Sequence, residues 1–228
     1  MRILLAGATG LVGQGVLREC LRAADVTHVT ALGRRPSGHS DPKLAAPKVA
    51  DPKVNDLVVP DFTDLGAIED RLRPFDACLY CAGAPPIGTA EAEYRHVTFD
   101  LTTHVAQTLA RLNPGLTFVY ISGAYANPDS HVMVLRIKGE TERALAALPI
   151  RTVMLRPGGI QPVGDERSPH AALAAMYRVA GPLMGLGVRL APQLLTTTER
   201  VGRAMLQLAR DVDPPSVVEN AEINRLGE

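Results

Sequence analysis

The sequence predicts an α/β fold in which a doubly wound, mostly parallel sheet carries helices on both faces. Three observations support this fold class. Short apolar runs alternate with helical patterns six times, a glycine-rich turn joins the first run to the first helix, and 228 residues are enough for one well-buried domain but too few for two large ones. We therefore expect a single domain over residues 1–228.

The first strand and helix are joined by a turn that suits an anion. Apolar residues 3–5 lead into GATGLVG at residues 7–13, and a helical pattern follows. Gly7 would let the chain leave the strand, Gly10 would leave no side chain between backbone and pyrophosphate, and Gly13 would let the helix lie against the sheet. The N–H groups at the start of the helix would face the anion. This arrangement is typical of a Rossmann-type dinucleotide site, which we assign to Gly7, Thr9, Gly10, Leu11, Val12 and Gly13.

Hydrophobic spacing predicts the elements that follow. The run at residues 75–82 is apolar apart from Asp76 near its start, as expected for a parallel strand covered on both faces. Other strands are expected at residues 26–33, 54–62, 116–122 and 151–156, with a last short one at Val217 and Val218. Helical stripes are formed by Val12, Val16, Leu17 and Leu21, by Leu65, Ile68 and Leu72, by Val97, Leu101, Val105, Leu109 and Leu112, and across residues 132–148.

The regular alternation weakens after residue 156. Thr196 and Glu199 have the spacing of a capping box and predict one more helix. The preceding apolar stretch, residues 171–195, is where we expect substrate to be held. We therefore divide the domain into a cofactor-binding core, 1–156, and a C-terminal substrate-side segment, 157–228. Residues 36–53 are rich in Pro, Ala, Ser and Lys and predict an exposed excursion.

Composition excludes several classes of partner. Lys plus Arg and Asp plus Glu both number 24, so the formal net charge is zero and no basic surface for nucleic acid or an anionic membrane is indicated. No apolar run reaches the ~20 residues that span a bilayer. Because the first strand starts at Arg2, we expect no signal peptide and predict a cytoplasmic protein with a small-molecule substrate. The sequence does not indicate the oligomeric state.

Cysteine and histidine spacing argues against metal chemistry. Cys78 and Cys81 form a C-x-x-C sequence, but it lies inside an expected strand, where residues three apart point to opposite faces. We therefore interpret these two residues and Cys20 as structural thiols. The six histidines include no pair spaced i, i+4, so we expect no metal site.

Two arginines follow the second strand. An acidic residue at this position, roughly 20 residues after the glycines, would bind the ribose 2′-hydroxyl of NAD. The chain has Arg34 and Arg35 there, and guanidinium groups can instead bind a 2′-phosphate by charge-assisted hydrogen bonds. We therefore predict NADP(H) as the cofactor. The alternative is a pair of solvated arginines on a loop.

These features together resemble the short-chain dehydrogenase/reductase superfamily, in its atypical and extended branch of NAD(P)-dependent epimerase/dehydratase-like proteins. The resemblance covers about residues 1–160 and adds Asp61-Phe62, CAGA at 81–84 and ISG at 121–123 to the glycine turn and the arginine pair. It implies that the adenine lies at Asp61 and Phe62. It also implies that the dinucleotide passes Ala82, Gly83 and Ala84 and places its nicotinamide near Pro157 and Gly158.

The resemblance also implies a catalytic set, and this chain departs from it. The superfamily uses a Ser on the fifth strand and Tyr-x-x-x-Lys on the next helix; Ser122 and Lys138 match, but Val134 stands where the tyrosine should be. A phenol with a lowered pKa can exchange a proton with a substrate oxygen, and valine cannot. Tyr125 is the candidate replacement, the alternative being a loop aromatic that packs on the 171–195 stretch. Lys138 can in either case bind the nicotinamide ribose.

Two functions remain open on the sequence alone. The first is an NADP(H)-dependent oxidoreductase-like or epimerase-like enzyme that acts on a small carbonyl or hydroxyl substrate, with Ser122 binding the reacting oxygen. The second is a protein that binds NADPH without turnover and acts as a redox sensor or partner-binding module. Val134 is the main support for the second function.

Overall fold

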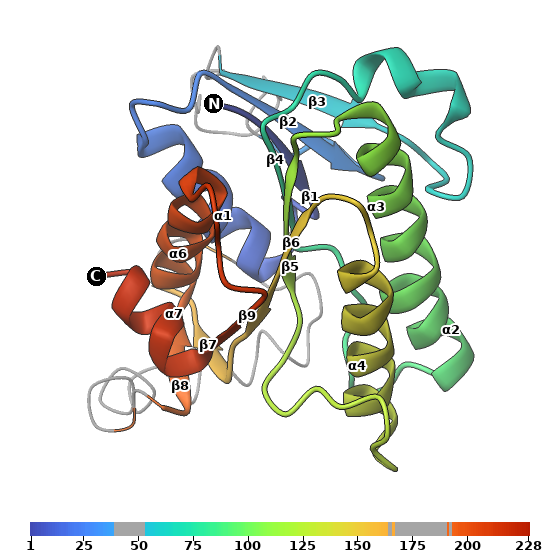
Figure 1. Cartoon of the computed structure of the whole chain (residues 1–228), viewed down its shortest axis with the longest axis vertical. Helices are drawn as coiled ribbons and strands as arrows, with labels where there is room; N and C mark the ends of the chain where they lie inside the picture. The colour runs from blue at the N-terminus through green and yellow to red at the C-terminus, as the bar shows by residue number, and fades with distance from the viewer. Residues whose placement is uncertain (39–52, 164–165, 167–190, 192) are drawn as a thin grey trace.

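The computed structural model describes residues 1–38, 53–163, 166, 191 and 193–228. Within these residues the main sheet has seven strands, in the order β3-β2-β1-β4-β5-β6-β9, and every pairing is parallel (Figure 1). The chain winds outward from β1 in both directions, so the doubly wound fold is confirmed. The strands are β1 (Arg2–Ala6), β2 (His28–Gly33), β3 (Val54–Val58), β4 (Ala77–Tyr80), β5 (Thr117–Ile121), β6 (Arg151–Arg156) and β9 (Val217–Glu219).

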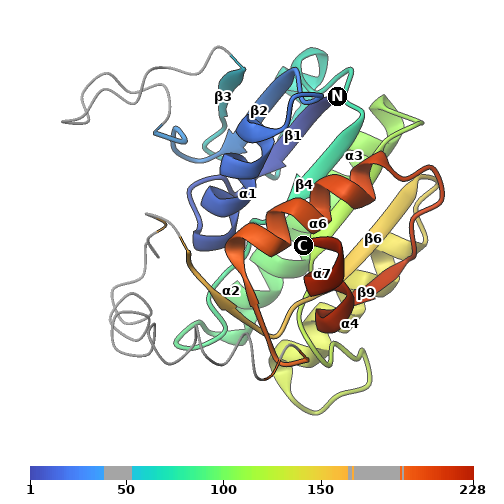
Figure 2. The same ribbon diagram turned by 90° about the vertical axis from the view of Figure 1, so that its left-hand side faces the viewer.

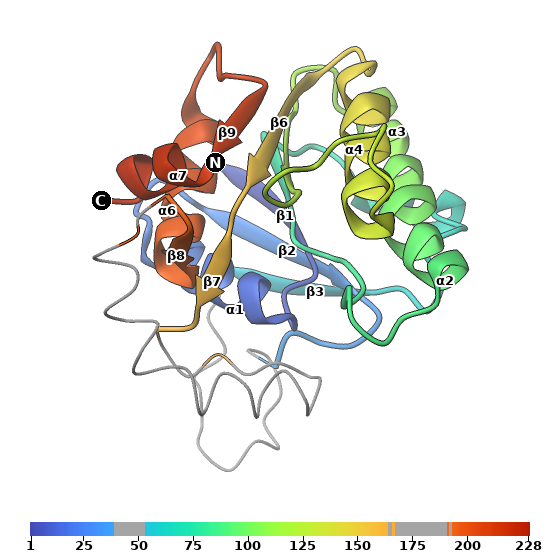
Figure 3. The same cartoon turned by 90° about the horizontal axis from the view of Figure 1, so that it is seen from below.

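Helices cover both faces of this sheet, as Figures 1 and 3 show. One face carries α1 (Leu11–Arg22), α6 (Thr198–Arg210) and α7 (Asn220–Leu226). The other carries α2 (Glu91–Arg95), α3 (Leu101–Leu112) and α4 (Met133–Ala146), with a π-helical turn, η2 (His96–Asp100), between α2 and α3. The remaining described elements are the 3-10 helix η1 (Gly66–Arg71) and the parallel pair β7 (Gly159–Gln161) and β8 (Leu195–Thr197).

Side chains that alternate along each strand fill two cores, one on each face. In β1, Ile3 and Leu5 pack into the core that includes residues of α1 and α6, whereas Leu4 packs into the core that includes residues of α3. The two cysteines of the C-x-x-C sequence divide in the same way, because Cys78 lies in the second core and Cys81 packs against the first. All three cysteines are free, as expected for structural thiols, and burial raises the pKa of Cys20 to about 12.

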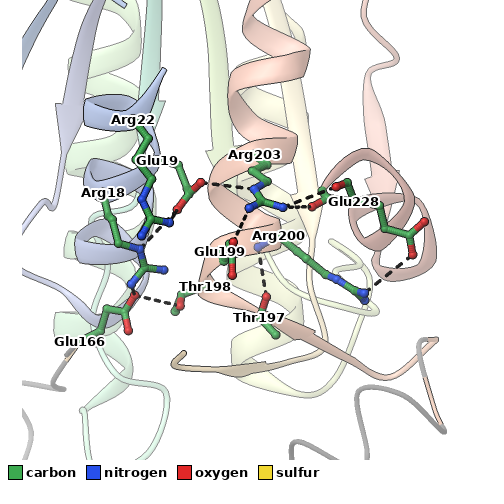
Figure 4. Close-up of polar contacts among 11 residues, drawn as sticks. Arg18, Glu19, Arg22, Glu166, Thr197, Thr198, Glu199, Arg200, Arg203 and Glu228 are labelled. Carbon is green, nitrogen blue, oxygen red and sulfur yellow. Dashed lines mark hydrogen bonds and ion pairs between the residues drawn. The ribbon is translucent and has the colours of Figure 1, made fainter. Parts of the chain in front are cut away.

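A polar cluster joins α1 to α6, which lie side by side in Figures 1 and 2. Glu19 is 5% exposed, and its carboxylate accepts hydrogen bonds from Arg18, Arg22 and Arg203 (Figure 4). Arg18 also pairs with Glu166. Helix α6 is thereby held against α1 by a buried carboxylate as well as by apolar packing. None of the described helices is long and apolar enough to cross a membrane.

Several element boundaries differ from those the sequence predicts. The strand expected over 54–62 ends at Val58, and the helix expected from Val97 begins at Glu91 and passes through η2. The expected capping box is displaced by one residue, because α6 starts at Thr198 and the hydroxyl of Thr197, not Thr196, accepts from the backbone N–H of Arg200 at 3.1 Å. Most of the 36–53 excursion and of the 171–195 stretch lies outside the described residues.

Candidate active site

A cavity of about 430 Å³ opens at the carboxyl edge of the sheet, where ligands of such sheets bind. It lies between the ends of β1, β4, β5 and β6 and the first turns of α4. Its walls are mostly apolar, and Lys138 is the single charged side chain among the described residues that line it. The predicted site residues that line it are Gly10, Leu11, Val12, Ala82, Gly83, Ala84, Ser122, Lys138, Pro157 and Gly158.

The glycine turn forms the part of the wall where α1 begins. Gly7 has φ +81°, and a Cβ there would lie 2.6 Å from the backbone nitrogen of Ala82; a Cβ on Gly13 would lie 2.0 Å from the oxygen of Gly7. Both positions therefore require glycine. Gly10 is the N-cap of α1, no side chain caps that helix, and its first turn has no acidic residue. The N–H of Gly10 donates to the oxygen of Gly7 at 3.0 Å, whereas the first N–H groups of the helix itself begin at Leu11 and Val12, which line the cavity and fit an anionic ligand.

The wall of the cavity also includes a buried hydroxyl group that has no hydrogen-bond partner within the described ranges. Ser122 follows β5 and is 5% exposed, and its Oγ has no hydrogen-bond partner among the described residues. Buried hydroxyl groups are almost always hydrogen bonded, so this one is free to bind a ligand oxygen. Ser122 therefore fits the role of holding a reacting oxygen.

Lys138 is positioned from two directions. Its Nζ donates to the carbonyl oxygen of Ile121 at 2.8 Å and to the phenol oxygen of Tyr120 at 3.1 Å. The ammonium also lies 4.8 Å from the centroid of the Tyr120 ring. Burial lowers the pKa of Lys138 to about 8, and the nearby charge of Glu142 opposes this shift.

The chain matches a known family over most of the residues that form this site. A model of the NAD dependent epimerase/dehydratase family matches residues 3–147, which is more than half of the chain. The chain belongs to that family. The glycine turn, Ser122 and Lys138 all lie within the matched residues, so the expected resemblance is confirmed.

Relatives with similar sequences include fungal proteins whose names describe them as mitochondrial. "Protein fmp52, mitochondrial" of Aspergillus fumigatus is 32% identical over 183 residues, which cover 78% of this chain and 74% of that protein. "Protein FMP52, mitochondrial" of Saccharomyces cerevisiae is 31% identical over 174 residues, which cover 74% of this chain and 68% of that protein. These names correct the expectation of a cytoplasmic protein, which rested on an apparent lack of a signal peptide and on the absence of a spanning segment.

Solved structures of similar fold extend over nearly the whole chain. MoeE5 in complex with UDP-glucose and NAD has a TM-score of 0.68 at 18% identity and covers 98% of this chain and 79% of that one. A double mutant of the dTDP-glucose 4,6-dehydratase DesIV from Streptomyces venezuelae has a TM-score of 0.68 at 16% identity. The match covers 100% of this chain and 80% of that one. At these identities the likeness concerns the fold.

Other predicted residues of this epimerase/dehydratase family member lie outside the cavity. Arg34 and Arg35 are exposed beyond the end of β2, and their side chains make no ion pair or hydrogen bond within the described part of the chain. The carboxylate of exposed Asp61 accepts from the N–H and hydroxyl of Thr63 at 2.8 and 2.7 Å. Phe62, 8% exposed, belongs to the core on the α3 face. Each of these four side chains therefore has only local contacts, or none, within the described residues.

Tyr125 is not brought to the cavity. Its side chain is 73% exposed, it does not belong to the cavity lining, and its φ of 63° places it in the left-handed region. Val134 does line the cavity, one helical turn before Lys138. The structure thus places an apolar side chain, and no phenol from Tyr125, beside Lys138.

Sequence reasoning missed two tyrosines of the site. Tyr94 on α2 lines the cavity and is 1% exposed, and Tyr120 on β5 is fully buried beneath Lys138. No spacing rule marks Tyr94, because its helix was not expected. Tyr120 could have been inferred, since residues 120 and 122 of a strand point to the same face. Among the described residues no group of three His, Cys, Asp or Glu side chains could hold a metal ion.

Proposed function

We propose that this protein binds NADP(H) across the carboxyl edge of its sheet and interconverts a small carbonyl compound and the corresponding alcohol. The observation that carries this proposal is the cavity itself. It brings together the first N–H groups of α1, the ammonium of Lys138 and the hydroxyl of Ser122, which has no partner within the described part of the chain. The family match and the NAD in the complex of MoeE5, which has a similar fold, support a nicotinamide dinucleotide as the cofactor.

The preference for NADP(H) rests on Arg34 and Arg35. They lie past the end of β2, where the adenosine ribose of a dinucleotide bound at the glycine turn would be expected. Both are exposed and free of carboxylate partners within the described residues, so binding a 2′-phosphate would break no existing ion pair. We assign the adenine contacts to Asp61 and Phe62, as the family resemblance implies.

The lining of the cavity favours an uncharged substrate. Leu11, Ile121, Val134, Leu135 and Ile160 supply apolar walls, and no carboxylate or arginine lines the described part of the cavity. Apolar walls with a few polar groups are typical of sites for small organic molecules. A bound nicotinamide would supply or accept a hydride. Ser122 would hold the oxygen that is formed or consumed.

A second candidate function is favoured by Val134. The tyrosine that would exchange the proton is absent, and Tyr125 lies outside the cavity. A protein that binds NADPH without turnover, and that signals the redox state to a partner, would need no such group. Fold alone does not decide between the two functions.

Consumption of NADPH tests the two functions against each other. The purified protein is incubated with NADPH and a panel of neutral aldehydes, ketones and quinones, and the loss of absorbance at the nicotinamide band is followed. We expect reduction of at least one carbonyl class. Binding of NADPH without any consumption across the panel would exclude the enzyme and support the sensor.

A further inference from the structure

We propose that Lys138 itself donates the proton to the oxygen of a carbonyl substrate held at Ser122, and that Tyr120 positions the ammonium group for this step. The inference rests on the proposed function and assigns the role left open by Val134. Lys138, Ser122 and Val134 line the same cavity. Because residue 134 is valine and not the tyrosine of the superfamily, the Lys138 ammonium faces the space that the tyrosine phenol would have filled.

The hydrogen bonds of Lys138 leave one proton for this purpose. An ammonium group has three N–H donors and no acceptor. Two are used by the oxygen of Ile121 at 2.8 Å and the phenol oxygen of Tyr120 at 3.1 Å. After the third proton leaves, the neutral amine still has two N–H groups for the same two acceptors. The two hydrogen bonds therefore hold the nitrogen in place in both protonation states. The proton that can be lost is the one that donates to neither Ile121 nor Tyr120.

The oxygen of Ile121 brings this nitrogen close to the substrate-binding hydroxyl. Ile121 directly precedes Ser122, whose buried Oγ has no partner among the residues that the structure describes. A carbonyl oxygen that accepts from Ser122 would lie on the side of the cavity where Lys138 is fixed. The backbone of the fifth strand thus sets the spacing between the two donors.

Tyr120 acts by holding Lys138, not by contacting substrate. Its side chain is 0% exposed and does not line the cavity, and its ring is held in a tilted contact with Tyr80 at 6.2 Å between centroids. Burial raises the pKa of the Tyr120 phenol well above 10, so the phenol stays neutral. The ring lies 4.8 Å from the Lys138 nitrogen, within the range of a cation–π contact. Tyr120 is therefore a positioning residue.

The surroundings of Lys138 suit an acid that works near neutral pH. Burial favours the neutral amine and lowers the pKa to about 8, while Glu142 favours the ammonium. Glu142 is itself paired with Arg156 at 2.6 Å, which limits its effect on the lysine. An acid with a pKa close to the working pH is mostly protonated yet releases its proton readily.

The step balances without any other co-reactant. A reduced nicotinamide, when bound, supplies the hydride that forms the new C–H bond and is itself oxidised. The π electrons of the carbonyl move to its oxygen, an N–H bond of Lys138 breaks and an O–H bond forms. The alcohol leaves, and the neutral amine regains a proton from water at the open side of the cavity.

Substitution of Lys138 by arginine separates proton donation from charge. K138R keeps a cation and its donors, but a guanidinium group does not release a proton in this pH range. We expect K138R to keep measurable NADPH binding, because the guanidinium group can still donate to the nicotinamide ribose, while reduction of 4-nitrobenzaldehyde, an α-diketone or a quinone at saturating NADPH falls by ~10²- to 10⁴-fold. V134Y introduced into K138R should restore part of the rate, because it returns a phenol to the cavity. Y120F should lower the rate less than K138R and shift its pH profile.

A direct titration gives a readout that does not depend on turnover. The pH dependence of the Lys138 Cε chemical shift in NADPH-bound protein, assigned by comparison with K138R, should give a pKa near 8, and Y120F should change it. Reduction by K138R at the wild-type rate would overturn the proposal and leave the proposed function standing. Loss of NADPH binding in the wild type, or NADPH binding with no reduction of any of the three carbonyl probes, would overturn the proposed function and this proposal with it, so turnover by the wild type shows which has failed.

Discussion

The Lys138 ammonium donates a 2.8 Å hydrogen bond to the carbonyl oxygen of Ile121, the residue immediately before Ser122. This bond links helix α4 to the end of strand β5, so the two polar groups that face the cavity are placed by one contact. Val134 lies one turn earlier on the same helix and lines the same cavity. The site of this chain therefore keeps the serine and the lysine of its superfamily in register although the tyrosine between them is lost.

Replacing Arg34 or Arg35 by alanine should weaken NADPH binding selectively. Each charge-assisted hydrogen bond contributes ~1.5–3 kcal/mol, so each substitution should raise the Kd for NADPH by roughly 10- to 100-fold. The Kd for NADH, which has no 2′-phosphate, should stay within about twofold. Isothermal titration with both dinucleotides measures the effect. Arg73→Ala, on the distant turn before β4, is the matched control, and an equal loss for NADPH and NADH in either test variant would argue against a 2′-phosphate contact.

Ser122→Ala should separate stability from activity. The Oγ of Ser122 is buried without a partner among the described residues, so its removal should leave the free energy of unfolding unchanged or raise it by up to ~1 kcal/mol. The rate of carbonyl reduction should fall by ~10²-fold or more, because the substrate oxygen loses the Ser122 hydroxyl as a hydrogen-bond donor. Urea unfolding and NADPH consumption check the two effects. A variant as active as the wild type would remove Ser122 from the site.

Gly13→Ala should prevent the glycine turn from forming. The added Cβ would lie 2.0 Å from the oxygen of Gly7, and that oxygen is backbone and cannot move aside cheaply. We expect a loss of more than ~2 kcal/mol in the free energy of unfolding and no measurable NADPH binding. Gly115→Ala is the control, because a Cβ there meets nothing within 4 Å. Comparable thermal stability of the two variants would contradict the packing described for α1.

The buried carboxylate of Glu19 should contribute more to stability than an exposed ion pair. Glu19→Ala removes the common acceptor of three arginines on α1 and α6, and we expect a loss of ~1–3 kcal/mol in urea unfolding. Glu222→Ala breaks the exposed pair with Arg225 and should cost less than ~0.5 kcal/mol. Equal effects would show that the α1–α6 contact depends on apolar packing alone.

The lowered pKa of Lys138 predicts how stability depends on pH. Between about 8, the pKa of Lys138 in the folded protein, and the ordinary lysine value, the unfolded chain binds a proton that the folded protein does not. Stability should therefore rise with pH through this window, relative to Lys138→Met, which has no group to titrate. Urea unfolding of both proteins at pH 7, 8, 9 and 10 gives the difference. Parallel stability profiles would mean that Lys138 titrates normally.

The sheet and its ligand-binding edge could be predicted because they depend on local patterns. Gly7 and Gly13 carry backbone constraints that no other residue meets, and the uniformly apolar strands follow from two covered faces. Because the strands are parallel, the residues that follow them, among them Ala82 and Gly158, meet Gly10 at one cavity.

The contacts within the site could not be predicted in the same way. The Tyr120–Lys138 contact joins a strand to a helix and depends on how the two pack, which spacing does not encode. Tyr94 faces the cavity through a helix with a π-helical continuation that has no sequence signal. Tyr125 looked suitable by its distance from Ser122 along the chain, but its left-handed backbone conformation accompanies a side chain exposed to solvent.

Thermal unfolding with NADPH, NADP+, NADH and NAD+ tests the central claim most directly. A ligand at ~100 times its dissociation constant stabilises the protein by roughly 2.7 kcal/mol. We predict a clear rise in Tm with NADPH and NADP+ and a smaller one with NADH and NAD+ at equal concentration. An equal rise with all four would contradict the role of Arg34 and Arg35. No rise with any of them would contradict dinucleotide binding at the glycine turn, and with it both candidate functions.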